Sequence, residues 1–312
     1  MGALRNTAVA VSAAFAFACS SSAFAGAGWN TLAAEPQALA ASMAGQINGI
    51  IYVAGGYNSL GSSPSSTLQA YNPVTNTWST LASMPAATQA GVAGVINGQL
   101  YVAGGQISGY TPVANLYAYN PATNSWTQLA SMPQACADGA AGVIDSKLYV
   151  TCPYPGTFGT TIFDVYDPVA NSWTALADSL KSHSLAATAV INGQFYVAGG
   201  DSPLRGFTEV YNPATNAWTR LANMRTPVGY TNGVELDGRL YALGGQNGSC
   251  PATPIAQYYD PTINKWKSLA MPTEQELSAP AVVYGIAFVL GGGTCSGIAG
   301  FSQDDVVTPS IP

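Results

Sequence analysis

Tyr71-Asn72-Pro73-Val74-Thr75-Asn76-Thr77-Trp78 is the first of five copies of one eight-residue phrase. In every copy, a tyrosine and a tryptophan seven residues later flank Asn-Pro or Asp-Pro and a second asparagine. The other copies are Tyr119 to Trp126, Tyr166 to Trp173, Tyr211 to Trp218 and Tyr259 to Trp266. Successive tryptophans are 48, 47, 45 and 48 residues apart, and Trp29 lies 49 residues before Trp78. Such a regular period predicts a repeat architecture, in which one supersecondary unit is stacked many times.

Each period carries the same strand and turn signals in the same order. A segment of small residues such as 90–96 precedes a turn dipeptide such as Asn97-Gly98, which tolerates the positive φ of a two-residue hairpin. A short apolar run ending in paired glycines, as in 100–105, indicates a buried strand. After a variable loop, a third strand ends at the repeated tyrosine, Asn-Pro or Asp-Pro makes a turn, and the tryptophan opens a fourth strand. Four antiparallel strands in each repeated unit predict a β-propeller.

The two ends of the chain complete one another in this ring. The last unit, after Gly291-Gly292-Gly293, has residues 303–308 for a third strand but lacks the Tyr–Trp phrase. Residues 29–33 resemble a fourth strand without a unit of its own, and placing them in the last blade removes the free edge at that joint. The sequence therefore predicts an all-β fold: a six-bladed β-propeller of four-stranded antiparallel blades, with the last blade closed by the N-terminal strand. Residues 26–312 then form a single domain.

The repeated aromatic residues and glycines have a structural interpretation. We expect the tyrosine and tryptophan rings to fill the wedge between adjacent blades, where large rings bury much apolar area. The glycine pairs are expected where side chains would prevent a close approach of backbones near the axis.

The succession of a glycine pair, Tyr-Asn-Pro or Tyr-Asp-Pro, tryptophan and Met-Pro resembles the kelch repeat. The resemblance extends from Gly28 onward, with two departures inside the ring. The third unit has Thr151-Cys152-Pro153 where Ala-Gly-Gly is expected. The column that often holds arginine in kelch repeats reads Leu39, Thr88, Cys136, His183, Val228 and Gln275 here.

Residues 1–25 have the pattern of a signal peptide. Arg5 precedes an apolar stretch at 8–18, and Ala23-Phe24-Ala25 fits a signal-peptidase site. The apolar stretch is too short to span a bilayer as a helix. We therefore expect a secreted, periplasmic or cell-surface protein without an integral membrane segment in the mature chain. Lipidation of Cys19 is the alternative, although the preceding Ala-Phe-Ala matches poorly the Leu-rich approach usual for such cysteines.

Charge is scarce and unevenly placed. Only 8% of the residues are charged, the formal net charge is −6, and no Asp, Glu, Lys or Arg lies between Glu35 and Asp138. Because no basic stripe is visible, nucleic acid is not an expected partner. We expect a monomer with a polar, uncharged surface.

Four cysteines follow the expected signal peptide, and an even number in an exported chain predicts disulfides. Cys250 and Cys295 follow the glycine pairs of neighbouring units, so their pairing is favoured. Pairing of Cys136 with Cys152 is the weaker expectation, because their hairpin register is offset by about four residues and the chain must bend. No Cys/His cluster has zinc-like spacing, and no metal is expected.

The kelch resemblance implies a binding face where the loops between second and third strands emerge beside the inter-blade loops. Loops carry function because the scaffold holds them while leaving them free to vary. Amides, tyrosines and a few charged groups suit a sugar or a peptide. The candidates in the second-to-third loops are Tyr57, Asn58, Gln106, Tyr110, Tyr154, Phe158, Asp201, Arg205, Gln246 and Asn247, and those in the inter-blade loops are Asp138, His183, Arg225 and Glu274.

No catalytic residue is assigned from the sequence. His183 is the only histidine, and alone it makes neither a His-based metal site nor a triad without a nucleophile and an orienting carboxylate. A hydrogen-bonded structural role is favoured for it. Copper-radical oxidases share the propeller architecture but need two histidines, so no cofactor is expected.

Three functions remain open at this point. The first is an exported recognition module, more readily non-catalytic than an enzyme, that binds a protein or a glycan through the loops of one propeller face. The second, implied by kelch-type sialic-acid mutarotases, is a sugar mutarotase or epimerase using Asp201, Arg205, Arg225 and Glu274 at the channel mouth. The third is a structural cell-surface protein. Fold alone does not choose among them.

Overall fold

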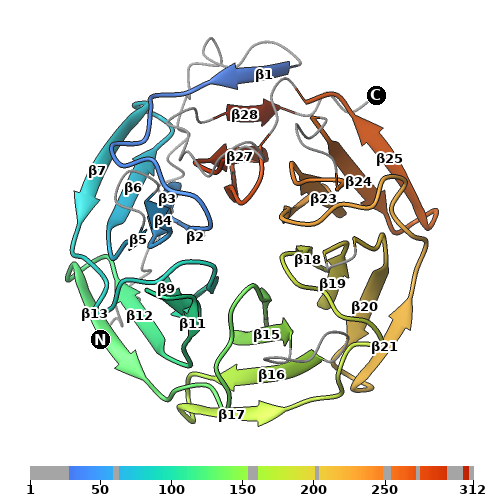
Figure 1. The fold of residues 1–312 in the computed structure, drawn as a ribbon, viewed down its shortest axis with the longest axis horizontal. Coiled ribbons are helices and arrows are strands. Elements are labelled where there is room, and N and C mark those ends of the chain that lie inside the picture. Colours follow the sequence, from blue (N-terminus) through green and yellow to red (C-terminus); the bar gives the residue numbers. More distant parts are fainter. Residues whose placement is uncertain are drawn as a thin grey trace, which may run out of the picture.

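The computed structural model describes residues 28–58, 63–153, 161–200, 204–248, 254–271, 275–293 and 305–308. The expected signal peptide and Cys19 lie outside these ranges. All strand pairs in the described part of the chain are antiparallel, and four-stranded sheets follow one another around a ring (Figure 1). In the same ranges, no helix has the length and apolar character needed to cross a membrane.

Five blades are built from consecutive strands, running outward from the channel. Blade one contains β2 (Met43–Ile47), β3 (Ile50–Ala54), β6 (Leu68–Asn72) and β7 (Thr77–Leu81), and blade two contains β8 (Val92–Ile96), β9 (Gln99–Ala103), β12 (Leu116–Asn120) and β13 (Ser125–Leu129). Blade three contains β14 (Ala140–Ile144), β15 (Lys147–Pro153), β16 (Thr161–Asp167) and β17 (Ser172–Ala175). Blade four contains β18 (Ala187–Ile191), β19 (Gln194–Ala198), β20 (Thr208–Asn212) and β21 (Ala217–Arg220), and blade five contains β22 (Asn232–Leu236), β23 (Arg239–Leu243), β24 (Ala256–Asp260) and β25 (Lys265–Leu269).

A composite sheet joins the two ends of the chain. It is formed by β26 (Ala279–Val283), β27 (Ile286–Leu290), β28 (Asp305–Thr308) and β1 (Gly28–Thr31), in that order from the channel outward. The backbone of Trp29 pairs with that of Val307. The predicted β-propeller of four-stranded antiparallel blades is thus confirmed. The six blades expected correspond to five blades of consecutive strands and this composite sheet, to which the N-terminal strand contributes as predicted.

Two small ribbons extend blades one and two beyond their four strands. β4 (Tyr57–Asn58) pairs with β5 (Ser63–Pro64) in the loop between β3 and β6. β10 (Gln106–Ile107) pairs with β11 (Thr111–Pro112) in the corresponding loop of blade two. Both ribbons therefore belong to the variable loops that follow a glycine pair.

The Tyr–Asn–Trp phrase joins each blade to the preceding outer strand. In blade two, the Asn124 Oδ1 atom accepts hydrogen bonds from the Ala82 backbone N–H and from the Tyr119 hydroxyl, at 2.9 and 2.8 Å. The Trp126 indole donates to the Ala82 carbonyl at 2.8 Å. Both backbone groups of one alanine are satisfied by the next blade, in an arrangement called here the Asn–Trp clamp. It recurs on Ala33, Ala130, Ala177 and Ala222.

The aromatic residues also fill the wedge between blades, as the sequence predicts. The repeated tyrosine is fully buried in all five blades, and the Tyr119 and Trp126 rings lie 5.2 Å apart. Tyr119 belongs to the same buried cluster as Met43 and Ala54 of blade one. The hydrophobic core is therefore distributed over the joints between blades, where burial of large rings stabilises the contact.

The glycine pairs let neighbouring blades approach closely, and this expectation is confirmed. A Cβ atom on Gly104 would collide with the carbonyl oxygen of Cys136, and Gly105 donates its N–H to that oxygen at 2.7 Å. The second glycines of blades one, four and five and of the composite sheet make the same contact. In blade three, Pro153 occupies this position and has no N–H to donate. The joint between blades three and four therefore lacks this link.

A disulfide joins Cys136 and Cys152, whose Cα atoms are 5.7 Å apart. This is the weaker of the two expected pairings. Ala140 pairs with Thr151, so Cys136 lies three residues before the position that faces Cys152, and the backbone bends through Asp138, whose φ is 57°. The Cys136 backbone is also hydrogen-bonded to Val113 and Gly105 of blade two. Cys250 and Cys295 lie outside the described residues, and their pairing stays a prediction.

We predict that Asn124→Ala lowers the free energy of unfolding by about 2 kcal/mol, because it removes two hydrogen bonds and places alanine at a left-handed φ of 48°. Asn124→Gly removes the same hydrogen bonds without the backbone strain, so it should cost roughly 1 kcal/mol less than the alanine variant. Urea unfolding followed by tryptophan fluorescence measures both. Equal stability of Asn124→Ala and the wild type would contradict the clamp.

Candidate binding site at the channel mouth

A hoop of backbone hydrogen bonds surrounds one mouth of the channel. Residues just before the innermost strands donate an N–H to the carbonyl of the equivalent residue one blade earlier, as Asp138 does to Ala90 at 2.8 Å. Blade five varies this pattern, since Thr231 rather than Tyr230 donates to Leu185. The last link runs from Ala41 to Leu277 and closes the hoop. The hoop residues have positive φ and are Ala41, Ala90, Asp138, Leu185, Tyr230 and Leu277.

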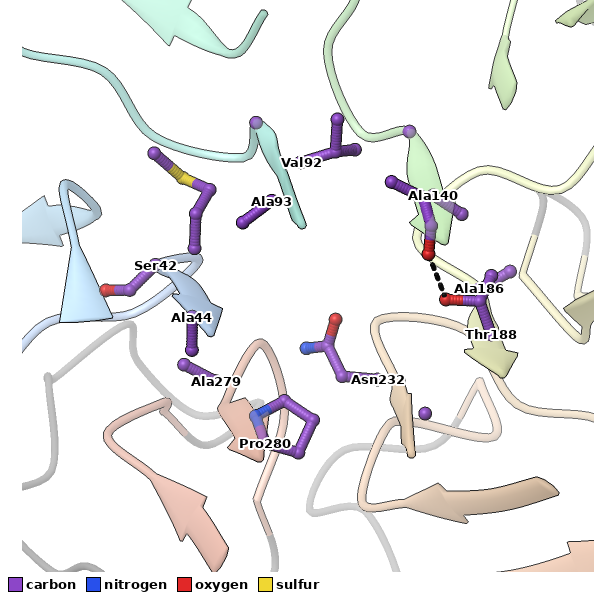
Figure 2. A pocket seen from close by; sticks show the side chains of 15 residues that line it. Ser42, Ala44, Val92, Ala93, Ala140, Ala186, Thr188, Asn232, Ala279 and Pro280 are labelled. Atoms are coloured by element: carbon purple, nitrogen blue, oxygen red, sulfur yellow. Dashed lines mark hydrogen bonds between the residues drawn. The ribbon is translucent and has the colours of Figure 1, made fainter. Parts of the chain in front are cut away.

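The channel inside the hoop is narrow and lined by the innermost strands. Its cavity has a volume of about 130 Å³ and is bordered mainly by alanine, glycine and other small residues (Figure 2). Ser42, Thr188 and Asn232 supply the side-chain polar groups of this lining. Thr188 donates to the Ala141 carbonyl at 3.1 Å, the dashed line in Figure 2, and Asn232 donates to the Ser278 carbonyl. Two of these three polar side chains therefore connect neighbouring inner strands.

The second-to-third loops emerge at the mouth that carries the hoop. Backbone bridges link Ala40 with Tyr57, Gln89 with Gln106, and Gly229 with Gln246. In each pair, the first residue directly precedes the hoop and the second follows a glycine pair. The sequence expectation that both sets of loops share one face is confirmed. This mouth and its loops are called here the hoop face.

A row of polar side chains crosses the hoop face from blade two to blade three. The Gln89 side-chain amide donates to Gln106 Oε1 at 3.5 Å, and the Gln106 amide donates to Asp138 Oδ2 at 3.3 Å. Gln89 is buried, whereas Gln106 and Asp138 are half-buried. Burial raises the pKa of the Asp138 carboxyl from its ordinary value to about 6. The row therefore ends in a carboxyl group that changes charge in mildly acidic solution.

His183 lies beneath the described surface of the hoop face. Its imidazole is completely buried, so it is not available to a ligand on the described surface. Nδ1 lies 2.9 Å from the Gly199 carbonyl, to which it must donate, and Nε2 lies 3.4 Å from Glu209 Oε2. Glu209 in turn accepts a hydrogen bond from the Leu180 N–H at 3.0 Å. His183 thus joins the linker before β18 to strands β19 and β20, and the structural role favoured by the sequence agrees with this burial.

The other candidates divide between described and undescribed residues. Tyr110 is 71% exposed at the tip of the β10–β11 ribbon. Arg205 and Arg225 are exposed in loops at the hoop face, following β19 and β21. Tyr57 and Asn58 form β4, and Gln246 and Asn247 follow the glycine pair of blade five. Tyr154, Phe158, Asp201 and Glu274 lie outside the described residues.

Gln89 is a residue of the face that sequence reasoning missed. It lies just before the small-residue segment of blade two, and nothing in its local pattern separates it from neighbouring polar residues. Only the bridge to Gln106, 17 residues later, gives it a place in the polar row. Within the described residues, no three His, Cys, Asp or Glu side chains gather in a way that could hold a metal ion.

Comparison with known proteins identifies the repeat. Residues 28–200 match the domain described as KLHDC2/KLHL20/DRC7 Kelch-repeats domain, and residues 182–225 and 228–272 match the Kelch motif. The fold is similar to that in a solved structure titled "Structure of YjhT", with a TM-score of 0.72 and 17% sequence identity over 89% of this chain and 95% of that chain. This identity supports a likeness of fold alone. No curated protein matches the chain.

We predict that the stability of the wild type relative to Asp138→Asn falls by about 2 kcal/mol between about pH 4 and about pH 7. The folded-state pKa of Asp138 is raised to about 6, so its favourable contribution is complete below the unfolded-state pKa and is lost as the pH rises through about 6. Urea unfolding at several pH values measures the difference. Asp145→Asn, at an exposed aspartate that also has positive φ, is the matched control. A pH-independent difference for Asp138→Asn would contradict the raised pKa.

Proposed function

The chain belongs to the kelch-repeat family, and on that premise we propose that it is an exported recognition module. It binds a protein or glycan ligand through the loops of its hoop face and is not primarily a catalyst. The observation that carries this proposal is the exposed Tyr110 ring on a ribbon fixed to blade two. An exposed aromatic ring on a loop held by a rigid scaffold suits contact with a ligand.

The way the ribbon is anchored supports this role. Gln106 exchanges backbone hydrogen bonds with Gln89 at 3.0 and 2.7 Å, and Val113 donates its N–H to Gly105 at 2.9 Å. Both ends of the ribbon are therefore tied to the blade. A surface held in place before binding loses less conformational entropy when the ligand arrives.

Sugar mutarotation at the same mouth is the second candidate. Arg205 and Arg225 are exposed in neighbouring loops of the hoop face, where the kelch-type mutarotase hypothesis places its cationic groups. The described lining of the channel carries no ionisable side chain, and the expected carboxylates Asp201 and Glu274 are not among the described residues. For this reason recognition is placed first.

Export is part of the proposal and has its own test. If the signal peptide is cleaved after Ala25, the N-terminal sequence of the protein recovered from outside the cytoplasm begins at Gly26. A lipid on Cys19 would require a membrane-anchored version of the same binding role, and recovery of the protein only from the cytoplasm with residues 1–25 retained would contradict export.

We predict that Ile107→Asp weakens ligand binding about tenfold, because it places a charge on the exposed ribbon that also carries Tyr110. Ile107 is 38% exposed on β10. Val169→Asp is the control, since Val169 is 95% exposed in the β16–β17 turn, away from the hoop face. Ligands are first found by glycan arrays and by pull-down of proteins from the same compartment, and affinities are then measured by calorimetry.

The same samples test the alternative. Anomer exchange of sialic acid and of neutral aldoses is followed by NMR with and without the protein. Faster exchange without stable binding would replace recognition by mutarotation. Equal losses in Ile107→Asp and Val169→Asp would show that the hoop face is not the contact surface.

A further inference from the structure

The polar row at the hoop face has a fixed direction. The Gln89 amide donates to Gln106, and the Gln106 amide donates to Asp138, so each donor points toward blade three. The row ends on a carboxyl group, which is an acceptor when ionised. A ligand that extends the row must therefore bring a donor to Asp138. Hydroxyl and amino groups meet this need, whereas a carboxylate or a phosphate does not.

The backbone holds this end of the row in place. The Asp138 N–H donates to Ala90, and its carbonyl accepts from Leu185, both at 2.8 Å, as part of the hoop. Gln106 is fixed by its two backbone hydrogen bonds to Gln89. The acceptor and the amide beside it are therefore positioned by two blades before any ligand binds, which reduces the entropic cost of recognition.

One exposed aromatic ring lies on the same ribbon as Gln106. Tyr110 is 71% exposed, and Ile107 on the same ribbon is 38% exposed. Tyr110 is four residues from Gln106, so their Cα atoms are at most about 14 Å apart. This span lies within reach of an oligosaccharide of several rings. Sugar rings present apolar C–H faces that stack on an aromatic side chain, while their hydroxyls donate to acceptors at the edge.

The surroundings of the row decide between a neutral and a charged ligand. Residues 36–137, which form blades one and two and both ribbons, contain no Asp, Glu, Lys, Arg or His. The described basic residues other than Lys147 all follow residue 180: Lys181, Arg205, Arg220, Arg225, Arg239, Lys265 and Lys267. Blades one and two therefore contribute no cation to attract an anion, and Lys147 of blade three is paired with Asp167 at 2.8 Å. Blades one and two supply no second acidic group, and a single carboxylate gives a cation little net attraction at a partly exposed site.

Resting on the proposed binding face, we propose that the ligand is a neutral, hydroxyl-rich glycan bound across blades two and three. The Tyr110 ring stacks on a sugar, and Gln106 and Asp138 hydrogen-bond its hydroxyls. Gln89 is a positioning residue that orients the Gln106 amide. Blades four and five, which carry most of the basic residues, take no part in this contact.

The test uses calorimetry with the wild-type protein and a panel of hexasaccharides. Neutral probes are chito-, cello-, malto- and xylohexaose, and charged probes are the chitosan hexamer and hexagalacturonate. The variants are Tyr110→Ala and Asp138→Asn. Their matched controls are Tyr284→Ala and Asp145→Asn, because Tyr284 is also 71% exposed and both control residues have positive φ in first-to-second-strand turns away from the hoop face. Thermal unfolding of each variant verifies that it is folded.

We predict that at least one neutral hexasaccharide binds, and that Tyr110→Ala and Asp138→Asn each weaken it roughly tenfold, while the controls change affinity less than about twofold. Preference for a charged probe, or equal losses in the controls, would overturn the neutral-glycan site. If no saccharide binds but a protein ligand is lost in Tyr110→Ala, the glycan inference fails and the recognition function stands. If neither class of ligand depends on the hoop face, both fail.

Discussion

The Asn–Trp clamp is the interaction on which the ring depends. The outer strand of a blade is an edge, and at five joints an alanine one or two residues beyond that strand has backbone groups without a partner in its own sheet. The next blade satisfies both groups of one alanine, its N–H through asparagine and its carbonyl through tryptophan, as at Ala82. The same asparagine also accepts from the buried tyrosine. One motif thus couples the polar and the apolar parts of each joint.

At the closing joint the clamp acts across the two ends of the chain. β1 pairs with β28 of the composite sheet, and Ala33, two residues after β1, is clamped by Asn76 and Trp78 of blade one. A segment shorter than ten residues therefore connects the last sheet to the first. The hoop at the channel mouth makes a second, independent closure through Ala41 and Leu277. The ring is therefore closed both at its outer edge, by β1 and Ala33, and around the channel, by the hoop. Because these contacts hold the scaffold, the loops of the hoop face are free to differ from blade to blade.

The joint between blades three and four shows how the ring tolerates a change. Pro153 removes the glycine link at this joint, and β15 and β16 are longer than their counterparts. Phe163 compensates from blade three, since its ring lies 4.7 Å from Tyr211 and 4.9 Å from Trp218 of blade four. The buried pair of His183 and Glu209 lies in blade four next to this joint. His183 stands at the position where kelch repeats often have arginine. We infer that this histidine is part of the altered packing at the joint between blades three and four.

The strands and turns that recur in every blade can be predicted from the sequence. The contacts between different blades are predicted poorly. The period of the Tyr–Trp phrase predicts the repeated blades, and the isolated strand-like segment at residues 29–33 predicts the closing strand. Both predictions succeed because each depends on a local sequence pattern. The alanine partners of the clamp lie about 40 residues before their tryptophans, and the hoop residues have no glycine or asparagine signature for positive φ. The sequence favours the Cys250–Cys295 pairing over Cys136–Cys152, because the bend at Asp138 that brings Cys136 to Cys152 is a consequence of the hoop. The polar row was missed for the same reason, since Gln89 meets Gln106 only after the blade has formed.

The most direct test of the account compares a chain that begins at Gly28 with one that begins at Glu35, using equilibrium urea unfolding. The shorter chain lacks β1 and Ala33, and therefore both the pairing with β28 and the clamp to Asn76 and Trp78. The account predicts a loss of at least roughly 3 kcal/mol in the free energy of unfolding, because several backbone hydrogen bonds and a sheet edge are left without partners. Identical unfolding midpoints for the two chains would contradict closure by the N-terminal strand.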